Sequence, residues 1–292
     1  MSDGDAIRRK VTAVKAGDGV RLTVRRDDPP IAASPRGTVV ALHGIQSHGG
    51  WYRRSSAAIA ASGWRALWPD RRGSGWSEHA TGDADRLIDD VERLLDDPAL
   101  VSPPVVLLGV SWGAKLATAV AVRRPVAGLA WVNPGLFSRF TPSAPARLAS
   151  RLLPGDLEVP IPLNDPALFT DDPARRAMIA ADPHARRTAD MTLLRATTEL
   201  DRRLAARTGR LDMPLLVQLA GRDQIVDNRR TRDRAETLAA DVTVREYADA
   251  RHTLEFSAAA DDAAADLVAW LGRLRADARG PDGRGGRDDR PQ

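Results

Sequence analysis

Residues 104–123 read PVVLLGVSWGAKLATAVAVR, and this stretch decides the fold. The continuous apolar run Pro104–Leu108 is typical of a buried strand, and Ala114–Val122 has the pattern of a helix. Between them lies the pattern G-x-S-x-G at residues 109–113, centred on Ser111. A sharp strand-to-helix turn strains the serine backbone and exposes its hydroxyl, and small residues two positions away avoid collisions with the neighbouring strand and helix. The stretch therefore predicts a nucleophilic serine.

Strand-like and helix-like segments alternate on both sides of this turn. Besides 104–108, strands are expected at 7–15, 20–26, 38–42, 64–68, 127–132, 215–219 and 242–247. The first two form a hairpin around Ala16–Gly19. Helices are expected at 51–62, 83–96, 114–122, 228–240 and 254–276. This order predicts an α/β fold with a mostly parallel eight-stranded sheet that is flanked by helices.

The alternation stops at residues 133–134. Between there and residue 211 we find no strand-like run, only candidate helices at 144–153, 173–181 and 186–207. We therefore predict a helical cap at 135–211, inserted after the sixth strand, between core segments 1–134 and 212–278. Residues 279–292 have little to bury and predict a disordered tail. Leu148, Leu152 and Leu153 could form an apolar face that contacts lipid transiently, but their spacing suits packing on the core, which we expect.

Composition excludes several classes of protein. The 292 residues are 43% hydrophobic and 28% charged, which is typical of a globular chain. The absence of cysteine excludes disulfides, thiolate chemistry and cysteine-bound zinc. The net charge of +4 is mild and acidic residues are interspersed, so nucleic-acid binding is not expected. No apolar run has transmembrane or signal-peptide character, which predicts a cytoplasmic protein without stable membrane insertion. The oligomeric state is not indicated.

A nucleophilic serine needs a base and an orienting acid, and both follow strands in this chain. Asp223 comes after the strand at 215–219, and His252 comes after the last strand. Their order after Ser111 is the order Ser, Asp, His that this kind of turn uses. Asp227 and Asp249 are rivals for the acid. Asp227 opens a helix and suits an N-cap, while Asp249 is too close to His252 in sequence, so Asp223 is preferred.

An oxyanion hole needs two backbone N–H donors. One is Trp112, directly after the nucleophile, and the other lies in the loop after the strand at 38–42, where position favours Ile45. His43 and His48 lie in the same loop without an acidic partner at ligand spacing, so we expect loop-structuring roles and no metal. Residues 70–72 are expected to tie their glycine-rich loop together by hydrogen bonds. No nucleotide-binding pattern is present, and no cofactor is expected.

The motifs together resemble the α/β-hydrolases of the monoacylglycerol lipase, lysophospholipase and serine aminopeptidase (S33-like) group. They are His43-Gly44-x-x-x-His48-Gly49, Asp70-x-Arg72-Gly73-x-Gly75-x-Ser77, Gly109-x-Ser111-x-Gly113, Gly221-x-Asp223 and His252. The resemblance covers residues 7–276 and implies a triad of Ser111, Asp223 and His252. It also implies an oxyanion hole formed by the residues after His-Gly and after the serine, which are Ile45 and Trp112.

Two residues depart from the pattern of this group. Trp112 replaces a smaller residue and is expected to restrict the size of the acyl group, and Lys115 is expected to face solvent or a carboxylate. The resemblance implies hydrolysis of a small-molecule acyl ester, such as a monoacylglycerol or a lysophospholipid, through an acyl-enzyme. Thioester, amide or peptide hydrolysis and acyl transfer remain open on the same triad. A non-catalytic binding protein of this fold is the alternative from another class.

Overall fold

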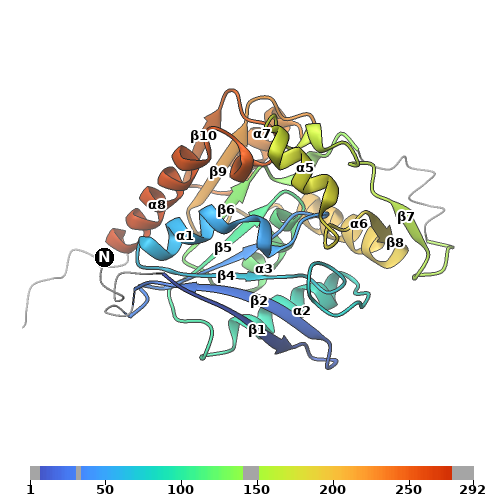
Figure 1. Ribbon diagram of the computed structural model, residues 1–292. Coiled ribbons are helices and arrows are strands. Elements are labelled where there is room, and N and C mark those ends of the chain that lie inside the picture. Colours follow the sequence, from blue (N-terminus) through green and yellow to red (C-terminus); the bar gives the residue numbers. More distant parts are fainter. Residues whose placement is uncertain (1–6, 31–33, 141–150, 278–292) are drawn as a thin grey trace, which may run out of the picture.

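An eight-stranded sheet runs through the computed structural model, which describes residues 7–30, 34–140 and 151–277 (Figure 1). The strand order is β1-β2-β4-β3-β5-β6-β9-β10. The strands are β1 (Arg8–Lys15), β2 (Arg21–Asp28), β3 (Thr38–Leu42), β4 (Arg65–Pro69), β5 (Val105–Val110), β6 (Gly128–Val132), β9 (Leu215–Ala220) and β10 (Val242–Tyr247). β2 is antiparallel to β1 and β4, and the other neighbours are parallel. This confirms the mostly parallel sheet of the α/β-hydrolase fold.

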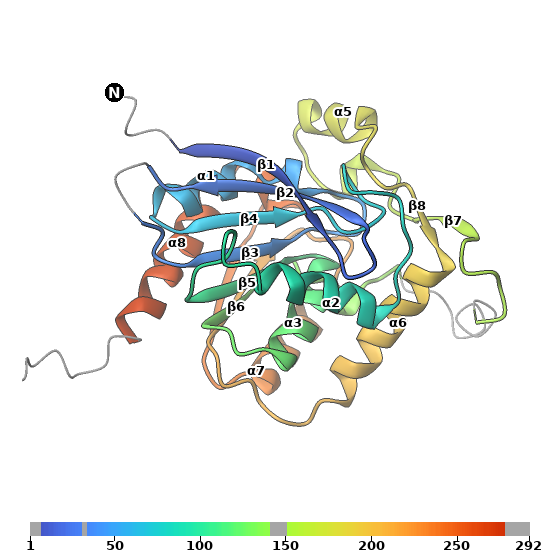
Figure 2. The ribbon, with the colours of Figure 1, turned by 90° about the horizontal axis from the view of Figure 1, so that it is seen from below.

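Helices cover both faces of this sheet, as strands that are buried on both sides require. All residues of β3 and β4 are buried. The helices of the core are α1 (Arg53–Ala61), α2 (Ala84–Leu95), α3 (Gly113–Arg123), α7 (Asn228–Leu238) and α8 (Ala260–Asp277). α1 and α8 lie on one face, and α2, α3 and α7 lie on the other (Figure 2). The core of the molecule is therefore three layers.

The first and last predicted helices are each divided in the structure. The 3-10 turn η2 (Gly49–Trp51) precedes α1, and the 3-10 turn η5 (Leu254–Phe256) precedes α8. η5 ends where Ser257 adopts an extended backbone, so the chain turns before α8 begins. Within the residues that the structure describes, no helix has the length and apolar character needed to cross a bilayer.

The chain between β6 and β9, residues 133–214, forms an insert beside the carboxyl ends of the parallel strands (Figure 2). It contains η3 (Gly135–Phe137), β7 (Glu158–Pro160), η4 (Pro166–Leu168), α5 (Pro173–Ala181), β8 (Thr188–Asp190) and α6 (Met191–Ala206). The expectation of no strand here is wrong, because β7 and β8 pair antiparallel. Three-residue strands are too short to show a period in sequence. α6 begins late because Asp190 accepts a hydrogen bond from the N–H of Leu193 and caps the helix.

The predicted apolar face of the insert does not pack as expected. Residues 141–150, which include Leu148 and most of the helix predicted at 144–153, lie outside the described residues, as does the predicted tail. The described residues 151–153 form a turn. Leu152 is 88% exposed and Leu153 is 41% exposed, so the expectation that they pack on the core is wrong. The division of the chain into core, cap and tail stays a prediction.

Close backbone contacts at the start of α3 explain the two glycines of the G-x-S-x-G motif. A Cβ on Gly113 would lie 2.1 Å from the carbonyl oxygen of Leu42, at the end of β3. A Cβ on Gly109 would lie 2.3 Å from the Cα of Ala114. Neither neighbour is a flexible side-chain end, so only the absence of a Cβ lets α3 approach the sheet this closely.

We predict that Gly113→Ala lowers the free energy of unfolding by at least about 3 kcal/mol, because the backbone of β3 cannot move away from the new methyl group. Gly272→Ala is the matched control, since Gly272 lies in α8 with no atom within 4 Å of the position that a methyl group would take. This control should gain about 0.4–1 kcal/mol through lower entropy of the unfolded chain. Urea unfolding monitored by tryptophan fluorescence measures both. Equal stability of the two variants would contradict the prediction.

Candidate active site

Ser111 lies at the turn between β5 and α3 in a conformation that few L-residues adopt. Its φ is 51°, in the left-handed region, as the strained turn requires. The N–H of Ser111 donates to the carbonyl of Val132 at 2.9 Å, and the N–H of Gly135 donates to the carbonyl of Ser111 at 2.8 Å. The end of β6 therefore holds both sides of the strained residue.

The side chains of Ser111, His252 and Asp223 form one hydrogen-bonded chain. Nδ1 of His252 lies 2.7 Å from Oδ2 of Asp223, and Nε2 lies 2.8 Å from Oγ of Ser111. A carboxylate only accepts, so Nδ1 carries the proton and Nε2 accepts from the serine hydroxyl. The side chains of His252 and Asp223 are 4% and 0% exposed. This arrangement can take the proton of Ser111 and stabilise the resulting imidazolium.

Asp223 is fixed by backbone donors, whereas its two rivals lie elsewhere. Its Oδ1 accepts from the N–H groups of Ile225 at 2.8 Å and Val226 at 3.1 Å. Asp227 caps α7 by accepting from the N–H of Arg230 at 3.1 Å, which is the structural role expected for it. Asp249 is exposed. Of the three candidate acids, only Asp223 contacts His252.

Asn133 joins the strand ends that carry these residues, and sequence reasoning missed it. Its Nδ2 donates to the carbonyl of His252 at 2.5 Å, and its Oδ1 accepts from the N–H of Ala220 at 2.7 Å. Its φ is 44°, a conformation that asparagine tolerates better than most residues. The signal in the sequence was an asparagine before a proline at the end of a strand, which indicates a turn but not its partners.

Two free N–H groups face the site where an oxyanion would form. Among the described residues, the N–H groups of Ile45 and Trp112 have no hydrogen-bond acceptor. The loop that carries Ile45 passes close to the serine, because a Cβ on Gly44 would lie 3.4 Å from Cβ of Ser111. Both residues chosen from sequence are therefore next to Ser111 with their donors available.

His43 is neutral and orients the peptide that carries the Ile45 donor. The N–H of Arg71 donates to Nε2 of His43 at 2.9 Å, so the ring proton must be on Nδ1, which donates to the carbonyl of Gly44 at 2.8 Å. That carbonyl belongs to the same peptide group as the N–H of Ile45. Burial, with the nearby charge of Arg71, lowers the pKa of His43 well below its ordinary value. The ring therefore stays neutral at physiological pH.

His48 has the loop-structuring role expected of it, but its partner comes from the insert. Its Nε2 donates to Oδ2 of Asp182 at 3.0 Å, and its Nδ1 accepts from the N–H of Gly50 at 3.0 Å. Burial lowers the pKa of His48, and the hydrogen bond to Asp182 opposes this. Within the described part of the chain, no group of histidine and acidic residues could hold a metal ion.

The loop at 70–72 is held by hydrogen bonds and ion pairs, as expected. Asp70 accepts from the N–H groups of Gly49 at 2.7 Å and Trp76 at 3.0 Å. Arg72 is buried and pairs with Asp90 at 2.6 Å, which ties this loop to α2. The loop thereby fixes the position of Arg71, which lies between these two residues.

The two residues that depart from the group pattern both contact α6. The indole Nε1 of Trp112 donates to Oγ1 of Thr197 at 2.9 Å. Lys115 is buried, and its Nζ donates to both carboxylate oxygens of Asp201 at 2.6 and 2.8 Å. Trp112 and Lys115 are three residues apart at the start of α3, and their partners are four residues apart on α6. The departures thus belong to one seam between α3 and the insert.

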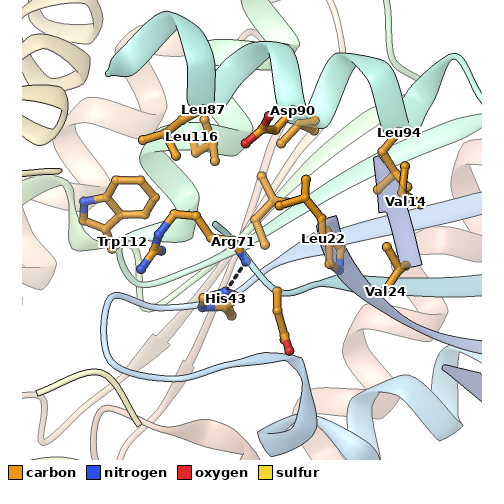
Figure 3. Close-up of a pocket in the computed structure, with 14 residues that line it drawn as sticks. Val14, Leu22, Val24, His43, Arg71, Leu87, Asp90, Leu94, Trp112 and Leu116 are labelled. Carbon is orange, nitrogen blue, oxygen red and sulfur yellow. Dashed lines mark hydrogen bonds between the residues drawn. The ribbon is translucent and has the colours of Figure 1, made fainter. Parts of the chain in front are cut away.

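The cavity in Figure 3 is an apolar gap in the core and not the catalytic pocket. It has a volume of about 30 Å³, and Ser111 is not among its lining residues. Such a volume holds about one or two water molecules at most. It lies between the β1–β2 hairpin, α2 and α3, with Trp112 at one end. We therefore assign it to imperfect packing behind Trp112.

We predict that Asp201→Ala destabilises the fold more than Lys115→Met does. Asp201→Ala leaves the buried ammonium of Lys115 without a counter-charge, which should cost about 1–3 kcal/mol given that Asp201 is partly exposed. Lys115→Met removes the charge itself and fills much of the same volume. The double variant should be no less stable than Asp201→Ala. Urea unfolding measures all three, and equal losses in the single variants would contradict this account of the seam.

A sequence profile of the family described as serine aminopeptidase, S33, matches residues 33–257. A search of curated proteins finds no match. A crystal structure of the Paleococcus ferrophilus monoacylglycerol lipase is similar, with 20% identity, a TM-score of 0.76 and coverage of 91% of this chain and 99% of that one.

A soluble variant of the Saccharomyces cerevisiae monoglyceride lipase, in complex with a substrate analogue, shows 16% identity and a TM-score of 0.79, over 94% of this chain and 98% of that one. A Bacillus coagulans carboxyl esterase in complex with glycerol shows 15% identity and a TM-score of 0.74, over 92% and 99%. At such identities these likenesses show the fold alone. The family profile covers most of the chain, and the protein therefore belongs to the serine aminopeptidase S33 family of α/β-hydrolases.

Proposed function

We propose that this protein is a serine hydrolase that cleaves carboxylic esters through an acyl-enzyme. The observation that carries the proposal is the hydrogen-bonded chain from Ser111 through His252 to Asp223, beside two N–H groups without acceptors. These parts match the nucleophile, base, orienting acid and oxyanion hole that acyl transfer requires. No cofactor has a role in this reaction.

The proposed reaction proceeds in two halves. Oγ of Ser111 attacks the ester carbonyl while Nε2 of His252 takes the hydroxyl proton, and the N–H groups of Ile45 and Trp112 hold the resulting oxyanion. When the tetrahedral intermediate collapses, His252 returns the proton to the leaving alkoxide. Water then attacks the acyl-enzyme with His252 as its base, and the carboxylic acid leaves. Asp223 keeps the proton on Nδ1 throughout and stabilises the imidazolium.

We propose a fatty-acyl ester of modest size as the substrate, such as a monoacylglycerol or a lysophospholipid. The insert brings an apolar side chain close to the site, because the ring of Phe169 lies 6.0 Å from that of His252. The indole of Trp112 is buried and bonded to α6, so it limits the room beside the oxyanion hole. Similar solved structures include monoacylglycerol lipases and a carboxyl esterase, which supports ester chemistry.

We expect the protein to hydrolyse p-nitrophenyl esters, with kcat/KM highest at intermediate acyl length and lower for palmitate. Ser111→Ala should abolish this hydrolysis and also labelling by a fluorophosphonate probe, because no other described serine contacts His252. Ser62→Ala is the matched control, since Ser62 only donates to the carbonyl of Ile59 at the end of α1. Labelling without ester hydrolysis would retain the nucleophile but contradict the ester substrate, and would favour amides or thioesters. No labelling of folded wild-type protein would favour a binding protein.

We also predict a contrast between the two neighbouring aspartates. Asp223→Asn should lower kcat by about 10⁴-fold, because an amide no longer selects the tautomer in which Nδ1 of His252 carries the proton. Asp227→Asn should leave kcat within about twofold, because asparagine is also a good N-cap. Steady-state kinetics on one ester, with melting temperatures for both variants, measure the contrast. A large loss of kcat in folded Asp227→Asn would contradict the assignment of the acid.

A further inference from the structure

Arg71 touches every residue that builds the proposed oxyanion hole. Its backbone N–H donates to His43, which in turn donates to the Gly44 carbonyl of the peptide that carries the Ile45 N–H. Its Nη2 donates to the carbonyl of Ile45 at 3.1 Å, on the other side of the same residue. Ile45 is therefore held from both of its peptide groups by one arginine.

The guanidinium of Arg71 also contacts the residue that supplies the second donor. It lies over the indole of Trp112, with 4.5 Å between Cζ and the ring centroid. Figure 3 shows the side chain of Arg71 reaching toward Trp112, and the hydrogen bond from its backbone to His43. Ile45 and Trp112 come from separate loops, and apart from their shared proximity to Ser111 this guanidinium is a direct link between them.

The charge of Arg71 has no carboxylate partner. Arg71 is 8% exposed, and within the described residues no carboxylate oxygen lies within 4.0 Å of it. The nearby Asp190 pairs with Arg186, and Asp70 accepts backbone N–H groups of its own loop. The guanidinium instead donates to neutral oxygens of Ile45 and Ser74, and its buried Nε has no partner. Burial, followed by the charge of Arg186, lowers the pKa of Arg71 to about 9, so it is cationic at neutral pH.

A buried cation without a counter-charge is costly, and it becomes favourable when a negative charge forms next to it. Ester hydrolysis forms such a charge between the N–H groups of Ile45 and Trp112, which are the residues that the guanidinium contacts. The field of a fixed cation in a buried site stabilises the transition state more than the uncharged ground state. The arrangement thus suits a reaction with an oxyanion intermediate.

We propose that Arg71 is the positioning residue of the oxyanion hole: it fixes the spacing of the Ile45 and Trp112 donors, and its uncompensated charge stabilises the oxyanion. This rests on the function proposed above. It assigns Arg71 no contact with the substrate. The residue acts through the two donors and through its field.

The experiment compares wild type, Arg71→Met and Arg71→Lys in the full chain. A trifluoromethyl ketone adds to Ser111 as a hemiketal whose oxygen occupies the oxyanion hole, and ¹⁹F NMR against pH gives the pKa of that oxygen. In Arg71→Met we expect this pKa to rise by about one to two units and kcat for a p-nitrophenyl ester to fall about 10- to 100-fold, with KM within about threefold. Arg71→Lys keeps the charge but not the two-sided contact, and should fall between.

Arg65→Met is the matched control, because Arg65 is also a buried arginine and lies at the opposite end of β4 from this loop. It pairs with Asp28 at 2.7 Å and donates to the carbonyl of Leu100, so its loss should lower stability. The hemiketal pKa should not move in this variant. The control separates a general loss of stability from a specific effect on the oxyanion.

An unchanged hemiketal pKa in folded Arg71→Met and Arg71→Lys would overturn the proposal and leave Arg71 a purely structural role. A loss of kcat/KM confined to esters that carry a carboxylate, again with an unchanged hemiketal pKa, would overturn it in favour of direct substrate binding. A wild-type adduct without ester hydrolysis would reject the proposed substrate class, while the shift in hemiketal pKa would still test Arg71. Absence of any adduct with folded wild type would overturn both proposals.

Discussion

The close approach of Gly113 to the carbonyl of Leu42 is the constraint on which the site depends. It lets the start of α3 lie against the end of β3, so that Ser111 and the His43–Ile45 loop are neighbours. A side chain on Gly113 would separate the hydroxyl from one of the two N–H donors. The left-handed backbone of Ser111 is strained, and the hydrogen bonds to Val132 and Gly135 hold it.

The remaining site residues arrive through the order of the sheet. β5, β6 and β9 are consecutive parallel strands, so the segments after them meet at one edge. Asn133, after β6, bonds to the end of β9 and to the carbonyl of His252. Without such a clamp, His252 and Asp223 would depend on two long loops for their spacing. A polar side chain that contacts no substrate thus sets the geometry of those that are proposed to do so.

The insert is coupled to the sheet by polar contacts at several places. His48 bonds to Asp182, and Trp112 and Lys115 bond to α6. The residues that depart from the pattern of the S33-like group are therefore explained by partners in the insert rather than by chemistry at Ser111. Because Trp112 also contacts Arg71, the insert, the oxyanion loop and the start of α3 form one connected unit.

Sequence by itself determined the sheet, the strained serine turn and the candidates Ser111, Asp223 and His252, because strand and turn patterns are local and strand order places their ends together. It did not determine the β7–β8 pair, the exposure of Leu152 or the clamp at Asn133. These depend on contacts between segments far apart in the chain, and short strands and single polar residues leave no period. Only the tertiary structure decided that the neutral His43 and the unpaired charge of Arg71 meet at Ile45. Burial and hydrogen-bond partners, which set the charge state of a ring and the cost of a cation, exist only once the chain has folded.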